Sequence, residues 1–311
     1  MKAFFDSLIQ KFPVRNSYEQ KEAFRNWVIK DAGECGLNVS VSEDHGHKNI
    51  VIGNAETAKV IFTAHYDTPW QSPWPNLMLP KDKALFWIYQ IGMLIPFLLV
   101  SFLAAFLVMR YVKLDYSQTV NRLIPLYAYL FTYYALFFLF IRGRKNRKNY
   151  NDNTSGVAAV LSVAKGLKPE ARDKAAFILF DNEERGKKGS KAFAKAHKEI
   201  YLHTPIINFD CVGLGSSFVV IEREAFKAKE VYDAFRRAYS GLNDVHFLSE
   251  KKAHANSDQT SFKLGIAVMA CKKTKRGILY VDRIHTNKDT VVDTENLNSL
   301  KNYSLEFIES L

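Results

Sequence analysis

The stretch "KAAFILFDNEERGKKGS" (174–190) decides the fold expected for this chain, because an apolar run passes into an acidic loop. Residues 174–180 predict a buried strand, and residues 189–197 predict the helix that follows it. Glu183 and Glu184 stand side by side in the loop between them, where their negative charges repel. This loop therefore indicates a partner of positive charge.

The alternation of strand and helix continues along the chain. Further strands are predicted at 38–42, 49–53, 58–65, 205–210 and 265–271. Helices are predicted at 17–36, where Ser17 and Gln20 fit a capping box, and at 153–167, 225–240 and 294–310. This order predicts an α/β fold with a mixed, mostly parallel sheet between helices.

The distribution of basic residues along the chain argues against a nucleic-acid partner. The 311 residues carry a net charge of +11, which permits an anionic partner. However, the basic residues cluster only at 142–148 and 272–276, and neither stretch has the interleaved aromatics or glycines of a single-strand binding surface. We therefore expect no nucleic acid to bind.

The cysteines and the first residues favour a reducing compartment. Cys35, Cys211 and Cys271 are scattered and odd in number, so neither a disulfide framework nor a CxxC zinc site is expected. Asp6 and Gln10 interrupt the short apolar stretch at the N-terminus, so no signal peptide is expected there.

Two long uncharged segments stand outside the α/β pattern. As helices, residues 84–109 would extend about 39 Å and residues 123–141 about 28 Å, against a bilayer core of about 30 Å. Two buried helices of a soluble core would need apolar contact on every face, which a domain of this size cannot easily supply. The sequence thus predicts a transmembrane hairpin at 81–148, inserted between the two parts of the α/β domain at 1–80 and 149–311.

Basic residues beside the two spans predict their orientation. The α/β side carries Lys81, Lys83, Arg142, Arg144, Lys145, Arg147 and Lys148. The connecting loop carries Arg110, Lys113 and Arg122. By the positive-inside rule, the larger number places the α/β domain in the cytoplasm, as part of an integral protein of the cell membrane.

Side chains that can bind a metal recur at the ends of the predicted strands and in the adjoining loops. They are His65, Asp67, Asp152, Glu183, Glu184, Asp210 and His285. In α/β sheets, ligands gather at the carboxyl ends of strands. Two histidines with several carboxylates suit Zn²⁺ or a similar divalent ion, so a metal site is expected there.

Five motifs in order resemble the M28 zinc peptidases, the di-zinc aminopeptidases and their relatives. They are "TAHYDT" (63–68), "NDNTSGVA" (151–158), "FDNEERGKKGS" (180–190), "INFDCVG" (207–213) and "RIHTNKDT" (283–290). The resemblance extends from about residue 58 to the C-terminus and excludes the hydrophobic hairpin.

The resemblance implies two zinc ions and a role for each candidate residue. His65 and Asp210 would hold one zinc, Glu184 and His285 the other, and Asp152 would bridge them. Asp67 would orient the His65 ring, and Asp258 in "ANSDQTSF" (255–262) would have a supporting role. Co²⁺ and Mn²⁺ suit such ligands too.

The adjacent glutamates then receive different roles. Consecutive residues leave a strand end in different directions, so one glutamate can bind metal while its neighbour faces the substrate water. The resemblance implies that Glu184 is the ligand and Glu183 the general base. The resemblance implies that zinc acidifies this water and polarises the scissile carbonyl, and that a free substrate amine binds beside the metals. An aminopeptidase is the function expected.

Three other functions fit the same residues. A glutaminyl cyclase-like acyltransferase would use a single zinc, and a carboxypeptidase or amidase would use the same metals on another end of the substrate. A catalytically silent membrane protein would only bind peptides. Because the hairpin interrupts the chain between His65 and Asp152, we expect hydrophobic or membrane-delivered peptides as substrates. The sequence indicates no oligomeric state.

Overall fold

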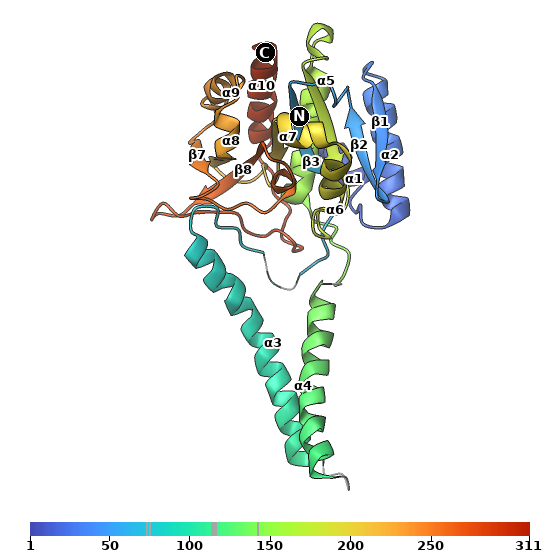
Figure 1. The fold of residues 1–311 in the computed structure, drawn as a ribbon, viewed down its shortest axis with the longest axis vertical. Coiled ribbons are helices and arrows are strands. Elements are labelled where there is room, and N and C mark those ends of the chain that lie inside the picture. Colours follow the sequence, from blue (N-terminus) through green and yellow to red (C-terminus); the bar gives the residue numbers. More distant parts are fainter. Residues whose placement is uncertain (73, 75, 113–116, 142) are drawn as a thin grey trace.

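The computed structural model describes residues 1–72, 74, 76–112, 117–141 and 143–311. It shows an α/β domain from which two long helices extend (Figure 1). The helices are α1 (Lys2–Lys11), α2 (Tyr18–Gly33), α3 (Lys83–Tyr111), α4 (Gln118–Ile141), α5 (Gly156–Gly166), α6 (Lys188–Ala196), α7 (Lys198–His203), α8 (Glu224–Lys227), α9 (Tyr232–Tyr239) and α10 (Thr294–Glu309). Short helical turns occupy Tyr150–Ser155, Pro169–Ala171 and Asp258–Ser261.

One sheet runs through the α/β domain in the order β1-β2-β4-β3-β5-β8-β6-β7, and β9 pairs with β8. Its strands are β1 (Val39–Asp44), β2 (His47–Ile52), β3 (Val60–His65), β4 (Ala175–Phe180), β5 (Ile206–Phe209), β6 (Ser217–Glu222), β7 (His246–Ser249), β8 (Gly265–Lys273) and β9 (Leu279–Tyr280). The central strands β4, β3, β5 and β8 are parallel, whereas β1, β2 and β6 join by antiparallel pairing. The expected mixed α/β fold is confirmed.

Helices cover both faces of the central strands, which explains their continuous apolar sequences. In β4, Phe177 and Leu179 belong to the core formed with α1, α2, α5, α9 and α10. Ile178 and Phe180 belong to the opposite core, formed with α6 and α7. Because neighbouring residues of a strand point to opposite faces, a strand covered on both sides needs apolar residues at every position.

Several boundaries and elements differ from the prediction. The helix expected at 225–240 is divided into α8 and α9 by a turn, and the helix expected to reach 36 ends at Gly33. The prediction also omitted α1, α7, β6, β7 and β9.

The helices α3 and α4 extend away from the α/β domain and approach each other toward their far ends (Figure 1). Both are long and apolar enough to cross a membrane by length and composition. Their large side chains are mostly exposed: Phe102 is 67% and Phe131 is 76% exposed. Such an apolar surface is far larger than the patches that soluble monomers expose.

Two segments join this helix pair to the domain and lie against each other. Trp70 forms a bridge with Lys145, and the Gln71 N–H donates to the Arg144 carbonyl at 2.7 Å. The first segment then crosses the 281–286 loop, where the Ser72 N–H donates to the His285 carbonyl at 2.6 Å. The base of the helix pair is therefore tied to a loop that carries a candidate metal ligand.

Candidate metal centre

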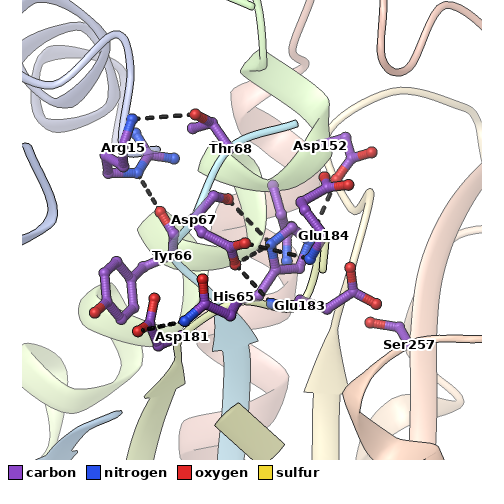
Figure 2. Close-up of polar contacts among 12 residues, drawn as sticks. Arg15, His65, Tyr66, Asp67, Thr68, Asp152, Asp181, Glu183, Glu184 and Ser257 are labelled. Atoms are coloured by element: carbon purple, nitrogen blue, oxygen red, sulfur yellow. Dashed lines mark hydrogen bonds and ion pairs between the residues drawn. The ribbon is translucent and has the colours of Figure 1, made fainter. Parts of the chain in front are cut away.

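The candidate residues come from strand ends and the loops beside them. His65 ends β3, Glu183 and Glu184 follow β4, and Asp210 directly follows β5. Because these strands are parallel, their carboxyl ends meet at one edge of the sheet. The turn before α5 supplies Asp152 and the loop between β9 and α10 supplies His285. Figure 2 shows His65, Asp152, Glu183 and Glu184 converging at this edge.

Asp152 lies between two groups of side chains. Its Oδ1 is 3.3 Å from His65 Nε2, which is also 3.9 Å from Asp210 Oδ1. Its Oδ2 is 3.0 Å from His285 Nε2, which is 3.5 Å from Glu184 Oε2. Within each group, one potential ligand atom per residue lies within 4.8 Å of the others. Each group therefore has the composition of a possible metal site, and both contain Asp152.

Burial and like charges disfavour ionised carboxylates at this edge. Burial raises the pKa of Glu184 to about 8 and that of Asp258 to about 7. Burial also raises the pKa of Glu183 well above its usual range, and the charges of Asp258, Glu184 and Asp210 add to this effect. These carboxyl groups therefore bind a proton, or another cation, more readily than they would in water.

The two histidines partly compensate for this charge. Burial opposes the ionisation of Asp152, but hydrogen bonds from His285 and His65 outweigh it and hold its pKa below the usual range. Burial lowers the pKa of His285, yet the Glu184 charge and the Asp152 hydrogen bond raise it to about 9. The site therefore attracts positive charge, here as protons.

The donor set fits a divalent metal. Within the described parts of the chain, no hydrogen-bond donor reaches the buried atoms Glu184 Oε1 and Asp210 Oδ1. A buried carboxylate oxygen without a donor is costly unless a cation takes its place. Imidazole nitrogens together with carboxylate oxygens are the ligands that zinc uses in hydrolytic sites.

Asp67 contacts both the first histidine and the glutamate loop. Its carboxylate accepts the N–H groups of Glu183 at 2.9 Å and Glu184 at 3.2 Å. The Nδ1 of His65 lies 3.1 Å from the Asp67 carbonyl oxygen and 3.5 Å from its carboxylate. The expected contact with His65 is therefore made mainly by the backbone, while the carboxylate holds the loop (Figure 2).

Asp289 performs the same task for Asp152, and the sequence prediction missed it. Its carboxylate accepts the N–H groups of Asn151 at 2.9 Å and Asp152 at 3.0 Å. Burial raises its pKa to about 7, against the opposing effect of these two donors. The only sequence signal was its position four residues after His285, in the same motif.

Arg15 is a second residue that the prediction missed. Its buried guanidinium donates to the Tyr66 carbonyl at 2.5 Å and to Thr154 Oγ1 at 2.9 Å. It thereby joins the segment after β3 to the turn that carries Asp152; Figure 2 shows its contacts with Tyr66 and Thr68. Burial lowers the pKa of Arg15 to about 10, so it remains charged at neutral pH.

A cavity of about 800 Å³ opens beside Glu184 and His285. Its other lining residues are Trp70, Ser72, Trp74, Asn76, Gln90, Met93, Arg185 and Lys188. The volume is typical of sites for small ligands. Gln90 and Met93 belong to α3, so the cavity extends from the candidate metal groups to the first apolar helix.

The chain belongs to peptidase family M28, whose sequence model matches residues 145–308. Membership of this zinc peptidase family supports a hydrolase and implies zinc and a peptide substrate. No curated protein sequence matches the chain.

Several solved structures share the fold. The glutaminyl cyclase of Porphyromonas gingivalis superposes with a TM-score of 0.60 at 14% identity, covering 99% of this chain and 96% of its own. A Zn-dependent exopeptidase from Parabacteroides distasonis gives 0.59 at 16% identity and covers 98% and 95%. The LapA aminopeptidase of Legionella pneumophila gives 0.59 at 11% identity and covers 98% and 69%. At these identities, the similarity establishes the fold alone.

Proposed function

We propose that the protein is a membrane-integrated di-zinc aminopeptidase. The observation that carries this proposal is the position of Asp152, whose two oxygens face separate groups of histidine and carboxylate beside a cavity of about 800 Å³. His65 and Asp210 would hold one zinc, and Glu184 and His285 the other. Co²⁺ or Mn²⁺ would fit the same donors. Bound zinc would supply Lewis acidity and lower the pKa of water.

Glu183 is the proposed general base. One of its carboxylate oxygens lies within 4.8 Å of a potential ligand atom of His65 and of one of Glu184, so its proton-accepting atom faces the proposed metals. It would take a proton from the attacking water and donate it to the leaving amine. Asp67 would position this carboxylate, because it holds the Glu183 and Glu184 backbone N–H groups.

Charge favours an aminopeptidase over a carboxypeptidase. The cavity reaches Glu184, whose Oε2 lies 3.5 Å from His285 Nε2 in a group that also contains Asp152, and a carboxylate there suits the ammonium group of a peptide N-terminus. The cations Arg185 and Lys188 line the cavity on the exposed side of the glutamate loop. A carboxypeptidase would need a cation beside the metal groups to bind the C-terminal carboxylate of its substrate. A glutaminyl cyclase stays the second candidate, because cyclases of this fold superpose with the chain.

We also propose that α3 and α4 span a membrane. The exposed apolar surface of both helices supports this, and so do the basic residues beside them. On the domain side the structure describes Lys81, Lys83, Arg144, Lys145, Arg147 and Lys148, and on the far side Arg110 and Arg122. Arg142 and Lys113, which the prediction also used, lie outside the described residues. The proposed division is 1–80 and 149–311 for the catalytic domain and 81–148 for the insertion, with the domain in the cytoplasm.

Peptide trimming tests the catalytic proposal. The detergent-purified protein is incubated with a mixed peptide pool and analysed by mass spectrometry, beside a chelated sample and the Glu183→Gln variant. Glu199→Gln, on the exposed surface of α7, is the matched control. We expect the wild-type protein and Glu199→Gln to remove N-terminal residues stepwise. Chelation and Glu183→Gln should each abolish this activity. Loss of ammonia without chain shortening would indicate a cyclase, and unchanged peptides a binding protein.

Orientation can be tested with the native cysteines. Cys35 is exposed in the α/β domain, whereas Cys211 and Cys271 are buried. A thiol reagent that does not cross membranes should therefore label inside-out vesicles and spare intact cells, with Cys35→Ser as the unlabelled control. Labelling of intact cells would contradict a cytoplasmic domain. Protein recovered in the soluble fraction would contradict the membrane spans.

A further inference from the structure

One face of α3 is turned toward the α/β domain over several turns. Phe86, Gln90, Met93 and Phe97 are buried or half-buried, and their spacing of three and four residues places them on one side of the helix. Between them, Ile88 is 67% and Ile91 is 60% exposed. The helix therefore presents a defined face to the domain and another to its surroundings.

Hydrogen bonds and a ring contact connect this face of α3 to the loop that carries the candidate ligand His285. Gln90 Nε2 donates to Asn76 Oδ1 at 3.2 Å, and the Trp74 ring meets the Phe97 ring edge-on at 6.0 Å. The segment that carries Trp74 and Asn76 is bound in turn to the 281–286 loop, where the Asn76 N–H donates to the Ile284 carbonyl at 3.3 Å. Ile284 directly precedes His285, so two hydrogen bonds, Gln90 to Asn76 and Asn76 to Ile284, connect α3 to the neighbour of the proposed ligand.

Gln90 and Met93 line the cavity that also contacts Glu184 and His285. They lie about 10 Å and 15 Å along the helix from its first residue, at 1.5 Å per residue. An occupant that contacts both must lie against the side of α3. This position is too far into the helix for a contact made only at its end.

We propose that Gln90 and Met93 are specificity-determining residues, which contact the substrate on the leaving-group side of the scissile bond and select an apolar residue there. The inference rests on the proposed aminopeptidase function. If the N-terminal residue lies beside Glu184 and His285, then the rest of the peptide follows the cavity toward Gln90 and Met93 of α3. The substrate class is a peptide with an apolar side chain at its second residue.

The chemistry of this wall suits such a peptide. Met93 is flexible and apolar, so it can adapt to apolar side chains of different shape. The Trp70 and Trp74 rings line the same cavity. Because the Gln90 amide donates its N–H to Asn76, its Oε1 is the atom that would accept an N–H from an extended peptide.

Kinetics with two substrates test the inference. The first is leucine 4-nitroanilide, which has a small leaving group, and the second is the peptide Leu-Phe-Ala-Ala. For the peptide, Met93→Ala should lower kcat/KM about tenfold, as loss of apolar contact in a pocket does, mainly through KM. For the anilide, kcat/KM should stay within about twofold. Ile91→Ala, on the exposed face of α3, is the matched control and should change neither substrate.

A binding measurement supplies a readout that needs no turnover. In the Glu183→Gln background, a peptide with a benzophenone side chain at its second residue is photo-crosslinked and the adduct mapped. Label on α3 around Met93, removed by excess unlabelled peptide, is the expected result. Label elsewhere, or equal kinetic effects of Met93→Ala and Ile91→Ala, would overturn the inference alone. In contrast, a wild-type protein that cleaves neither substrate would overturn the proposed function.

Discussion

Replacement of Asp67 by asparagine is the most informative single change. The side chain keeps its shape but loses its charge, and one acceptor oxygen becomes an NH₂ donor. That donor would face the N–H of Glu183 or Glu184, which now donate to the carboxylate at 2.9 Å and 3.2 Å. One backbone N–H of this half-buried loop is therefore left without an acceptor.

The expected cost follows from these contacts. A hydrogen bond to a charged group contributes about 1.5–3 kcal/mol, and an unpaired buried donor costs about 1–3 kcal/mol. Burial opposes the charge of Asp67, but the His65 hydrogen bond and charge, the Lys21 charge and the Glu183 N–H together hold its pKa below the usual range. Its charged form is therefore favoured in the fold. We expect the free energy of unfolding to fall by about 3 kcal/mol and the Tm by about 6 °C.

The same change should weaken cation binding, because the backbone of Glu184 and the ring of His65 lose their support. Loss of such a supporting contact typically lowers metal affinity 10- to 100-fold. Thermal unfolding followed by tryptophan fluorescence measures stability, and competition with a chromogenic chelator measures Zn²⁺ affinity. Asp173→Asn, exposed in the turn before β4, should change both little. An Asp67→Asn protein with wild-type Tm and Zn²⁺ affinity would refute the reasoning.

Three further changes test other parts of the site. Glu183→Gln should lower single-turnover rates about 10²- to 10⁴-fold at unchanged zinc content, and normal turnover would exclude it as the base. Lys21→Met removes the partner that lies 2.7 Å from buried Asp181, so chemical denaturation should show a loss of about 3–5 kcal/mol, partly recovered by adding Asp181→Asn. No recovery would contradict a charge effect. Gly189→Ala places a Cβ 2.1 Å from the Asp181 carbonyl oxygen, so it should cost about 3 kcal/mol, unlike Gly33→Ala, which meets nothing within 4 Å. Equal stability of these two variants would show that the loop around Asp181 can move away from the added Cβ, and would contradict the predicted cost.

The central strands could be predicted from the sequence because helices cover both their faces. In β3 and β4 every residue is buried; β4 reads as an unbroken apolar run, and β3 is interrupted only by Thr63 before it ends at His65. In contrast, all four residues of β7 are half-buried, and this gives neither an apolar run nor an alternation. In α1 only Phe5 and Leu8 are buried, which is too little for a helical period to stand out. β6 carries the same apolar signature as β4 and was omitted from the prediction.

Residue chemistry and strand ends predicted which side chains gather at the metal centre, although their roles remain proposals. The same reasoning could not find the residues that hold the backbone in place. Arg15 bonds to Thr154, 139 positions away, and Asp289 acts on the N–H groups of Asn151 and Asp152. A contact between groups far apart in the sequence has no local pattern, so only the folded chain shows it.

The place of the helix pair in the chain has a consequence for biosynthesis. β3 is made before α3 and α4, yet it pairs with β4 and β5, as in the pair Val60 and Ala175, which are separated by the whole insertion. The ribosome must therefore deliver both apolar helices before His65 can meet Asp152. If the chain is the membrane-spanning peptidase proposed above, its site can form only after the ribosome has made both helices and the turn that carries Asp152.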